Sequence, residues 1–196
     1  MGRLTGHRGE QPLDQGTVSI LVVCTANICR SPMGEALVRA AFAEVGAPVS
    51  VRSAGLLEGG RPASPAAAEV LRPRGLDITE HVSRRVDAEL VEAADLVLVM
   101  ERLHARELAT LAPDALDRIH LLKALAAEAD RLPGTVDDLR RWAEQVGAAR
   151  PPTALVGDRQ RDEVADPHGR SKRHHRAAAD EIERAARSIA RVAPRR

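Results

Sequence analysis

Short apolar runs alternate along the chain with segments in which apolar residues recur at helical spacing. Four runs predict strands: Val18 to Val23, Val49 to Ser53, Asp95 to Met100 and Ile119 to Leu122. The apolar sequence of the first and third runs is typical of strands that are buried in a parallel sheet. The helical spacing predicts four helices: Ser31 to Val45, Ala66 to Arg72, Leu103 to Leu111 and Ser171 to Val192. Strands that alternate with helices indicate right-handed βαβ units. We therefore expect a single α/β domain with a four-stranded parallel sheet flanked by helices.

The first predicted helix has recognisable ends. Ser31 followed by Pro32 is typical of a helix N-cap with proline at the first helical position. Gly46 is typical of the residue that follows a helix. We therefore expect Ser31 to cap this helix.

The length of 196 residues fits one domain, which we expect to occupy residues 17–196. Residues 1–16 are polar and rich in Gly, so we expect a disordered N-terminal extension there. Residues 130–163 are rich in Pro, Gly and charge around a short helical pattern, which predicts a surface insert. The sequence has no signal-peptide pattern and no apolar stretch of membrane-spanning length, so we expect no membrane contact.

The composition narrows the class of protein. Hydrophobic residues make up 44% and charged residues 29%, as in folded proteins, and with one Phe, one Trp and no Tyr the core must be aliphatic. A net charge of +1 gives no basic field that would attract nucleic acid. Two cysteines cannot build a disulfide scaffold, and no zinc-ligand spacing occurs. We therefore expect reactive thiols in a reducing cytoplasm, with no metal and no cofactor.

The segment from Val23 to Pro32 carries the clearest chemical pattern. Cys24 directly follows a buried strand, and after five residues Arg30 and Ser31 open a helix. This order puts a thiol at the carboxyl edge of the sheet, beneath backbone N–H groups that favour a tetrahedral anion. The sequence therefore predicts a phosphate-binding loop after the first strand.

The residue types in this loop suit phosphoryl transfer. The N–H groups favour the thiolate of Cys24, which is a nucleophile, and Arg30 offers a planar pair of donors to two phosphate oxygens. Ser31 Oγ can donate to the Cys24 sulfur, and Asn27 tolerates the left-handed backbone of a sharp turn. Cys29 fits two interpretations, a buried thiol without a chemical role or a redox partner of Cys24.

A cysteinyl-phosphate mechanism also needs a proton donor for the leaving group. Asp166 is the candidate, because Pro167 stiffens the neighbouring backbone and restricts Asp166 to an extended conformation. Asp-Pro is also common in ordinary turns, so a purely structural role for Asp166 stays open.

These motifs resemble the low-molecular-weight protein tyrosine phosphatase family. The resemblance rests on Cys24, Arg30, Ser31, Asp166 and Pro167, and it continues through stretches at 52–55, 75–81 and 95–104. It implies a monomeric phosphatase that acts on phosphotyrosyl proteins, in which Ser53 and His81 brace Asn27. It also implies that the following residues bind phosphate or support the loop: Thr25, Ala26, Asn27, Ile28, Cys29 and Ser31.

The sequence departs from the family pattern around the substrate. Ala26 stands where many members carry Gly, and Leu56, Leu57 and His168 replace the aromatic residues that usually stack on the substrate ring. Ile28 stands where arginine-specific relatives carry Thr. We expect its branched apolar side chain to line the rim and to favour phosphotyrosine, with a protein arginine phosphatase of the same fold as the alternative.

Three other interpretations fit parts of the sequence. An arsenate reductase on this fold needs shuttle cysteines far downstream, and none follows Cys29. A non-catalytic module that binds phosphoproteins or anions is disfavoured by the intact set of Cys24, Arg30 and Asp166. Histidines at 168, 174 and 175 suggest metal ligands, but the Arg and Lys residues around them favour a solvated basic start of a helix.

Overall fold

The computed structural model describes residues 17–155 and 160–195. Its strands are β1 (Val18–Cys24), β2 (Val49–Gly55), β3 (Leu96–Val99) and β4 (Ile119–Leu121). They pair in parallel in the order β2-β1-β3-β4, which confirms the predicted α/β class and four-stranded parallel sheet. The helices are α1 (Arg30–Glu44), α2 (Pro65–Leu71), α3 (Ala88–Glu92), α4 (Arg102–Leu111), α5 (Leu122–Asp130), α6 (Leu139–Ala148) and α7 (Lys172–Val192). Short 3₁₀ turns span Arg72–Arg74, Pro113–Arg118, Pro152–Leu155 and Gln160–Asp162.

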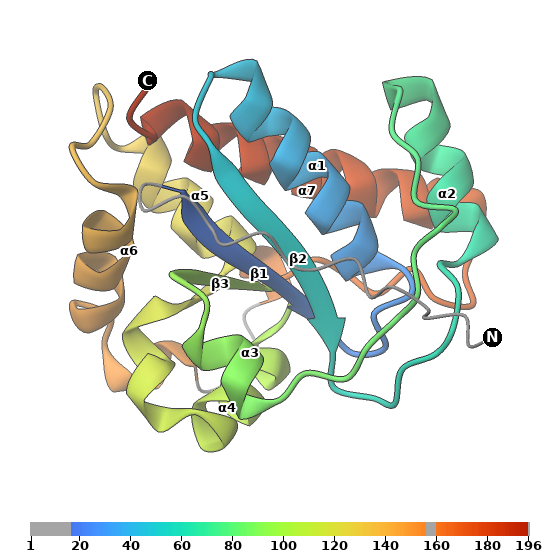
Figure 1. The fold of residues 1–196 in the computed structure, drawn as a ribbon, viewed down its shortest axis with the longest axis horizontal. Helices are drawn as coiled ribbons and strands as arrows, with labels where there is room; N and C mark the ends of the chain where they lie inside the picture. Colours follow the sequence, from blue (N-terminus) through green and yellow to red (C-terminus); the bar gives the residue numbers. More distant parts are fainter. Residues whose placement is uncertain (1–16, 156–159, 196) are drawn as a thin grey trace, which may run out of the picture.

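Helices cover both faces of the sheet (Figure 1). In β1, Ile20 and Val22 belong to the larger core, which they share with α1, α2, α5 and α7. Leu21 and Val23 belong to the smaller core, which they share with α3 and α4. Alternate residues of a strand point to opposite faces, so a strand buried on both faces has an uninterrupted apolar sequence.

The start of α1 differs from the prediction. The helix begins at Arg30, and its N-cap is Cys29, without a side-chain capping bond. The prediction that Ser31 caps the helix is wrong, because its hydroxyl turns toward the preceding loop and bonds Cys24 and Asn27. Pro32 still lies in the first helical turn, where backbone N–H groups lack an acceptor within the helix.

The sequence patterns did not predict α3 and α5. α3 has five residues, and α5 follows β4 without a break, so the apolar Leu122 looked like the end of the strand. Within the 130–163 segment, Leu139 and Ala143 of α6 are buried in the same core as α5 and α7. That segment therefore contributes to core packing.

Two expectations concern the chain beyond the sheet. Residues 1–16, for which a disordered extension is expected, lie outside the described residues. Within 17–155 and 160–195, no helix has the length and apolar character needed to cross a membrane.

Candidate active site

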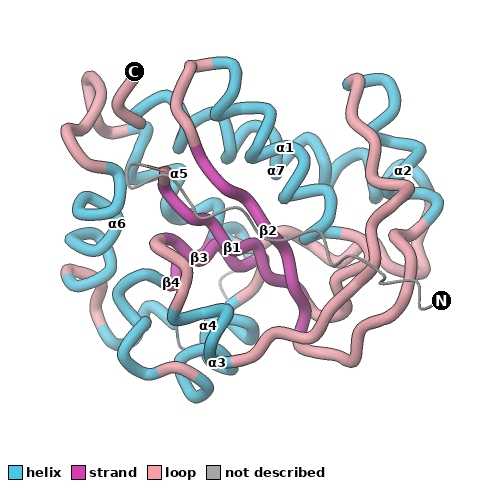
Figure 2. Tube along the Cα trace, in the orientation of Figure 1, coloured by secondary structure: helices cyan, strands magenta, loops and turns pink. Residues whose placement is uncertain are grey.

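The loop between β1 and α1 lies at the carboxyl edge of the sheet. Cys24 ends β1 and Arg30 begins α1. The parallel register puts Gly55, the last residue of β2, beside Cys24, and Figure 2 shows the loops after β1 and β2 at the same end of the sheet. A Cβ on Gly55 would lie 2.7 Å from the backbone nitrogen of Asn27. Glycine at this position therefore allows the loop to pass close to β2.

Asn27 is the centre of a buried hydrogen-bond network. Its φ of 53° is left-handed, as predicted. Its Nδ2 donates to Ser31 Oγ at 2.8 Å and to Ser53 Oγ at 3.0 Å, while its Oδ1 accepts from the backbone N–H of Arg84 at 2.9 Å. His81 Nε2 donates to the Asn27 carbonyl at 2.8 Å. Ser53 and His81 thus lie where the resemblance places them, and the network holds the turn by protein contacts alone.

Cys24 lies at the bottom of the loop, with 3% of its surface exposed. Its sulfur is 3.0 Å from Ser31 Oγ, and the same hydroxyl lies 3.2 Å from the Ala54 carbonyl. Ser31 has a single hydroxyl hydrogen, which bonds the sulfur when Cys24 is a thiolate and the carbonyl when the thiol itself donates. Rotation of one hydroxyl therefore lets Ser31 accommodate both protonation states of Cys24.

The buried Arg30 guanidinium is held by two carboxylates. Its Nη1 lies 2.7 Å from Glu101 Oε1, and its Nη2 lies 2.9 Å from Asp166 Oδ2. Nη1 also donates to the Val164 carbonyl at 3.0 Å, and Nη2 donates to Thr25 Oγ1 at 3.3 Å. The Asp166 side chain is 45% exposed and that of Glu101 is 26% exposed. An entering anion therefore competes for Arg30 mainly with Asp166.

The segment that carries Asp166 is attached to both β3 and the loop. The Val164 N–H donates to the carbonyl of Met100, just after β3, at 2.9 Å. Asp166 Oδ1 accepts from the backbone N–H of His168 at 3.1 Å, which closes a short turn. One carboxylate oxygen thus serves the turn while the other faces Arg30, so a turn role and an acid role are compatible.

Cys29 is a buried thiol on the same loop. The pKa of Cys29 is raised to about 11, above all by burial; a hydrogen bond with Ser64 opposes this rise, and the nearby Cys24 adds to it. The Cys29 sulfur lies 3.9 Å from His168 Nδ1. Cys29 is therefore a protonated thiol at neutral pH, and its redox partnership with Cys24 stays a prediction.

The predicted substrate walls differ in their exposure. Leu57 is 53% exposed and His168 is exposed, whereas Ile28 is only 4% exposed. The expectation that Ile28 presents its branched side chain at the rim is wrong, because the loop packs this side chain inside. Ala26 is not among the residues of positive φ in the described part of the chain, so alanine fits there without strain.

Glu101 and His104 belong to the site, although the sequence analysis gave them no role. They form a capping box at the start of α4: the Glu101 side chain accepts from the His104 N–H, and His104 Nδ1 accepts from the Glu101 N–H at 3.1 Å. This box sets Glu101 against Arg30 and His104 against Thr25. The available signal was Glu-x-x-His directly after a strand that pairs with β1.

Metal binding finds no support in the residues that the structure describes. Within them, no three or more His, Cys, Asp or Glu residues group so as to hold a metal ion. The histidines at 168, 174 and 175 belong to no such group in this part of the chain.

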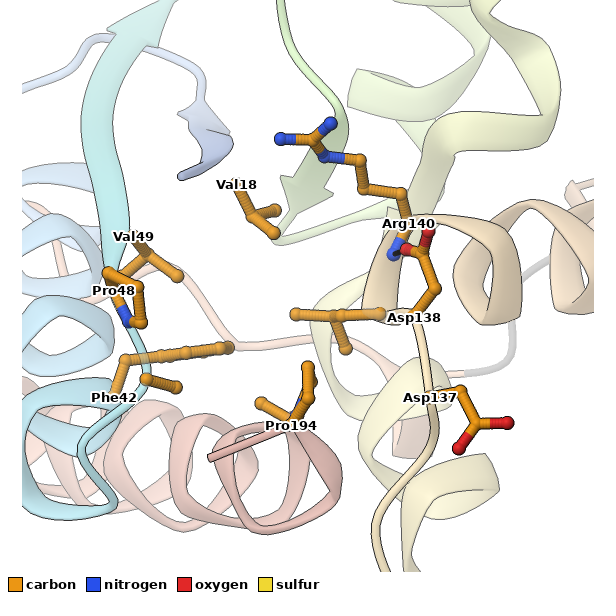
Figure 3. A pocket seen from close by; sticks show the side chains of 11 residues that line it. Val18, Phe42, Pro48, Val49, Asp137, Asp138, Arg140 and Pro194 are labelled. Atoms are coloured by element: carbon orange, nitrogen blue, oxygen red, sulfur yellow. Dashed lines mark hydrogen bonds between the residues drawn. The ribbon is translucent and has the colours of Figure 1, made fainter. Parts of the chain in front are cut away.

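A separate cavity of about 340 Å³ lies at the other end of the sheet. Its wall includes Val18 and Val49, which begin the two strands that end beside the loop. Figure 3 shows Phe42 and Pro194 on its apolar side and Arg140 on its polar side. This cavity therefore takes no part in the chemistry at Cys24.

Comparison with known proteins gives consistent results. Residues 19–143 match the family model described as low molecular weight phosphotyrosine protein phosphatase. A probable low molecular weight protein-tyrosine-phosphatase EpsP of Ralstonia solanacearum is 48% identical over 91 residues, which cover 46% of this chain and 60% of that protein. The protein-arginine-phosphatase of Bacillus subtilis is 39% identical over 107 residues, which cover 54% of this chain and 71% of that one.

A solved structure extends the likeness over most of the chain. The low molecular weight protein tyrosine phosphatase from T. tengcongensis is similar to this chain with a TM-score of 0.67 and 28% identity, and the match covers 88% of this chain and 97% of that one. The family match spans more than half of the sequence and includes the whole loop from Cys24 to Ser31. The chain therefore belongs to the low molecular weight phosphotyrosine protein phosphatase family.

Proposed function

We propose that this protein hydrolyses phosphotyrosine in proteins through a cysteinyl-phosphate intermediate. Cys24 is the nucleophile, Arg30 binds the phosphoryl group, and Asp166 acts first as acid and then as base. The observation that carries the proposal is the contact of 2.9 Å between Arg30 and Asp166, which brings the acid segment over the loop that holds the buried Cys24 sulfur.

In the first step, the Cys24 thiolate attacks phosphorus and a sulfur–phosphorus bond forms. The bond from phosphorus to the ester oxygen breaks, and this oxygen takes the proton of Asp166 as it leaves. Negative charge on the equatorial oxygens is stabilised by Arg30 and the loop N–H groups.

In the second step, a water molecule attacks the phosphocysteine and gives its proton to Asp166. The sulfur–phosphorus bond breaks, which releases phosphate, and Ser31 Oγ at 3.0 Å donates to the departing thiolate. An Asp166 that carries a proton also loses its ion pair with Arg30. Protonation of the acid and release of the guanidinium for phosphate are thereby coupled.

The depth of the nucleophile supports a long phosphorylated side chain. Because Cys24 is 3% exposed, a phosphate must reach down into the loop to meet its sulfur. Phosphotyrosine has this reach and phosphoserine does not. The exposed Leu57 and His168 then flank the ring at the mouth.

A protein arginine phosphatase is the second candidate. It is favoured by the 39% identity to the protein-arginine-phosphatase of Bacillus subtilis. We prefer phosphotyrosine because the exposed Leu57 and His168 offer flanks for an aromatic ring at the mouth of the loop.

The nucleophile supports a proposal about the setting of the reaction. Cys24 works only as a free thiol, and both cysteines are free in the structure. We propose that the enzyme acts as a monomer in the cytoplasm, where thiols stay reduced.

The test is hydrolysis of a chromogenic aryl phosphate by the wild type and by Cys24→Ser. We expect Cys24→Ser to abolish turnover while inorganic phosphate still binds, because the anion cradle survives without its nucleophile. Mass spectrometry of the acid-quenched wild type should find phosphate on the peptide that contains Cys24. Turnover that persists in Cys24→Ser would refute the mechanism, and no turnover in the wild type would leave a non-catalytic phosphate-binding module.

Substrate choice is tested with phosphotyrosyl, phosphoarginyl and phosphoseryl peptides of one sequence. We expect turnover of the phosphotyrosyl peptide with a high KM and little action on the phosphoseryl peptide. Faster turnover of the phosphoarginyl peptide would overturn the choice of tyrosine and leave the cysteine chemistry intact.

A further inference from the structure

A buried histidine contacts the residue next to the nucleophile. His104, which is 0% exposed, lies with Nε2 at 3.0 Å from Thr25 Oγ1. Its other ring nitrogen, Nδ1, faces the backbone N–H of Glu101 at 3.1 Å. The ring therefore connects the start of α4 with the first residue after Cys24.

These contacts fix the tautomer of His104. A backbone N–H can only donate, so Nδ1 must be the acceptor and the hydrogen of the neutral ring is on Nε2. Burial, followed by the charge of Arg30, lowers the pKa of His104 to about 3, so the ring is neutral at working pH. His104 Nε2 therefore donates to the Thr25 hydroxyl at 3.0 Å, which is nearer than the other acceptor beside it, Glu101 Oε2 at 3.5 Å.

Thr25 Oγ1 also accepts from a second donor. Arg30 Nη2 lies 3.3 Å from it, and this nitrogen is the one that holds Asp166 Oδ2 at 2.9 Å. A hydroxyl oxygen has two lone pairs, which the two donors occupy. The hydroxyl hydrogen of Thr25 must then point away from both His104 and Arg30.

Arg30 Nη2 contacts two oxygens, Thr25 Oγ1 at 3.3 Å and Asp166 Oδ2 at 2.9 Å. Thr25 Oγ1 and the Asp166 oxygen share one guanidinium nitrogen, so a phosphoryl oxygen that replaces the Asp166 oxygen comes within reach of Thr25. We propose that Thr25 donates its hydroxyl hydrogen to an equatorial oxygen of the transferring phosphoryl group, and that His104 is the positioning residue that directs this hydrogen. The inference rests on the proposed function.

The effect belongs to the transition state. Charge gathers on the equatorial oxygens as phosphorus is transferred, so a donor aimed there lowers the barrier more than it tightens binding of the substrate. Loss of this donor should lower kcat and change KM little.

The test compares Thr25→Val, which keeps the shape and removes the hydroxyl, with Thr25→Ser, which keeps the hydroxyl. We expect Thr25→Val to lower kcat on an aryl phosphate about tenfold to hundredfold. Thr25→Ser should stay within about threefold of the wild type. Thr110→Val is the matched control, because Thr110 is exposed on α4 and its hydroxyl donates to the Arg106 carbonyl, away from the loop.

His104→Phe tests the positioning role. It removes the donor and keeps the bulk, and we expect kcat to fall in the same direction as in Thr25→Val, by a smaller factor. Because His104 acts through Thr25, the double variant should be no slower than Thr25→Val alone. Multiplied losses in the double variant would show that His104 acts independently and would overturn its role.

Three results on Thr25 would overturn the inference. The first is a wild-type kcat in Thr25→Val, and the second is an equal loss of kcat in Thr25→Ser and Thr25→Val. The third is a loss of kcat confined to substrates with poor leaving groups, which would show that Thr25 supports proton transfer from Asp166. If the wild type hydrolyses no aryl phosphate, the proposed function fails separately. The hydrogen bond is then measured with orthovanadate. Weaker orthovanadate binding in Thr25→Val than in Thr25→Ser supports the inference, and equal binding refutes it.

Discussion

The two sides of the loop from Cys24 to Ser31 are built differently. On one side, the uncharged Asn27 is 0% exposed, and both its amide group and its carbonyl are engaged by neighbouring residues. On the other side, the charged Arg30 is held by Glu101 and by the partly exposed Asp166. The contacts of Asn27 are made to protein groups, whereas in the proposed mechanism Arg30 has to exchange its contact with Asp166 for a phosphate oxygen. The Asn27 side of this short loop thus maintains its shape, and the Arg30 side carries the charged groups for the proposed chemistry.

Among the variants that keep Cys24, replacement of Asp166 by Asn should give the largest effect on chemistry. The amide cannot protonate the leaving group, so we expect turnover of a poor leaving group such as phenyl phosphate to fall about a hundredfold or more. A good leaving group such as p-nitrophenolate needs the proton less and should be affected much less. Inorganic phosphate should inhibit more strongly, because the carboxylate no longer competes for Arg30.

Asp162→Asn is the matched control for this prediction. Asp162 lies in the same segment but pairs with Arg102 at 2.9 Å and not with Arg30. It should leave the ratio of the two rates unchanged. Equal loss for both leaving groups in Asp166→Asn would remove Asp166 from the acid role.

Replacement of Asn27 by Ala should affect the stability of the fold. The substitution leaves buried partners without their hydrogen bonds and puts alanine in the left-handed region, so we expect the free energy of unfolding to fall by about 2–4 kcal/mol. Urea unfolding measures this loss, and turnover should fall as well. Asp166→Asn, which alters an exposed carboxylate, should unfold like the wild type. An unchanged stability of Asn27→Ala would contradict the division between the two sides.

The dependence of stability on pH tests two buried histidines, one beside the loop and one in the sheet. Burial lowers the pKa of His104 to about 3 and, in β4, that of His120 to about 4, with Arg30 and Arg150 as the respective second causes. As the pH falls below about 6.5, these two histidines take up protons in the unfolded chain but stay neutral in the folded chain. Stability should therefore decrease between about pH 6.5 and pH 4, by at most about 1.4 kcal/mol per pH unit for each histidine.

Single variants show which histidine causes this dependence of stability on pH. His104→Phe and His120→Phe should each make urea unfolding less dependent on pH than in the wild type. Only His104→Phe should also lower kcat, because His120 does not contact the loop. A slope that is unchanged in both variants would show that other groups set the acid sensitivity.

Whether a feature of this protein could be predicted from the sequence depends on how far apart along the chain the contacting residues lie. Buried strands such as β1 were predictable because both of their faces are apolar, and the loop from Cys24 to Ser31 was predictable because its chemistry lies within one short segment. The contacts of Asn27 with the Arg84 N–H and of Arg30 with Glu101 were not, since they join distant segments and one uses a backbone group, which no side-chain pattern marks.

The errors have physical causes as well. Ser31 has a good capping side chain, but the loop offers its hydroxyl partners inside the site. Ile28 was placed at the rim from its position in the motif, yet the fold buries it. In both cases tertiary contacts decided between two conformations that the local sequence allows.

The smallest predicted effect concerns the mouth of the site. The backbone N–H of His168 donates to Asp166 Oδ1 at 3.1 Å. This bond fixes the backbone from which the His168 side chain extends, beside Asp166. His168→Tyr puts a larger aromatic ring there, and stacking on the substrate ring is worth about 1 kcal/mol. We expect the KM for phosphotyrosyl peptides to fall roughly fivefold, with kcat unchanged.

His174→Tyr gives the matched control, because His174 is exposed at the start of α7. If both variants lower KM equally, the tighter binding comes from an added aromatic ring anywhere on this surface, and His168 is not a wall of the site. The tyrosine also removes the 3.9 Å contact between His168 Nδ1 and the Cys29 sulfur. Because Cys29 is a protonated thiol at neutral pH, this loss should leave turnover unchanged, so a drop in kcat would show that the mouth and the loop are coupled through Cys29.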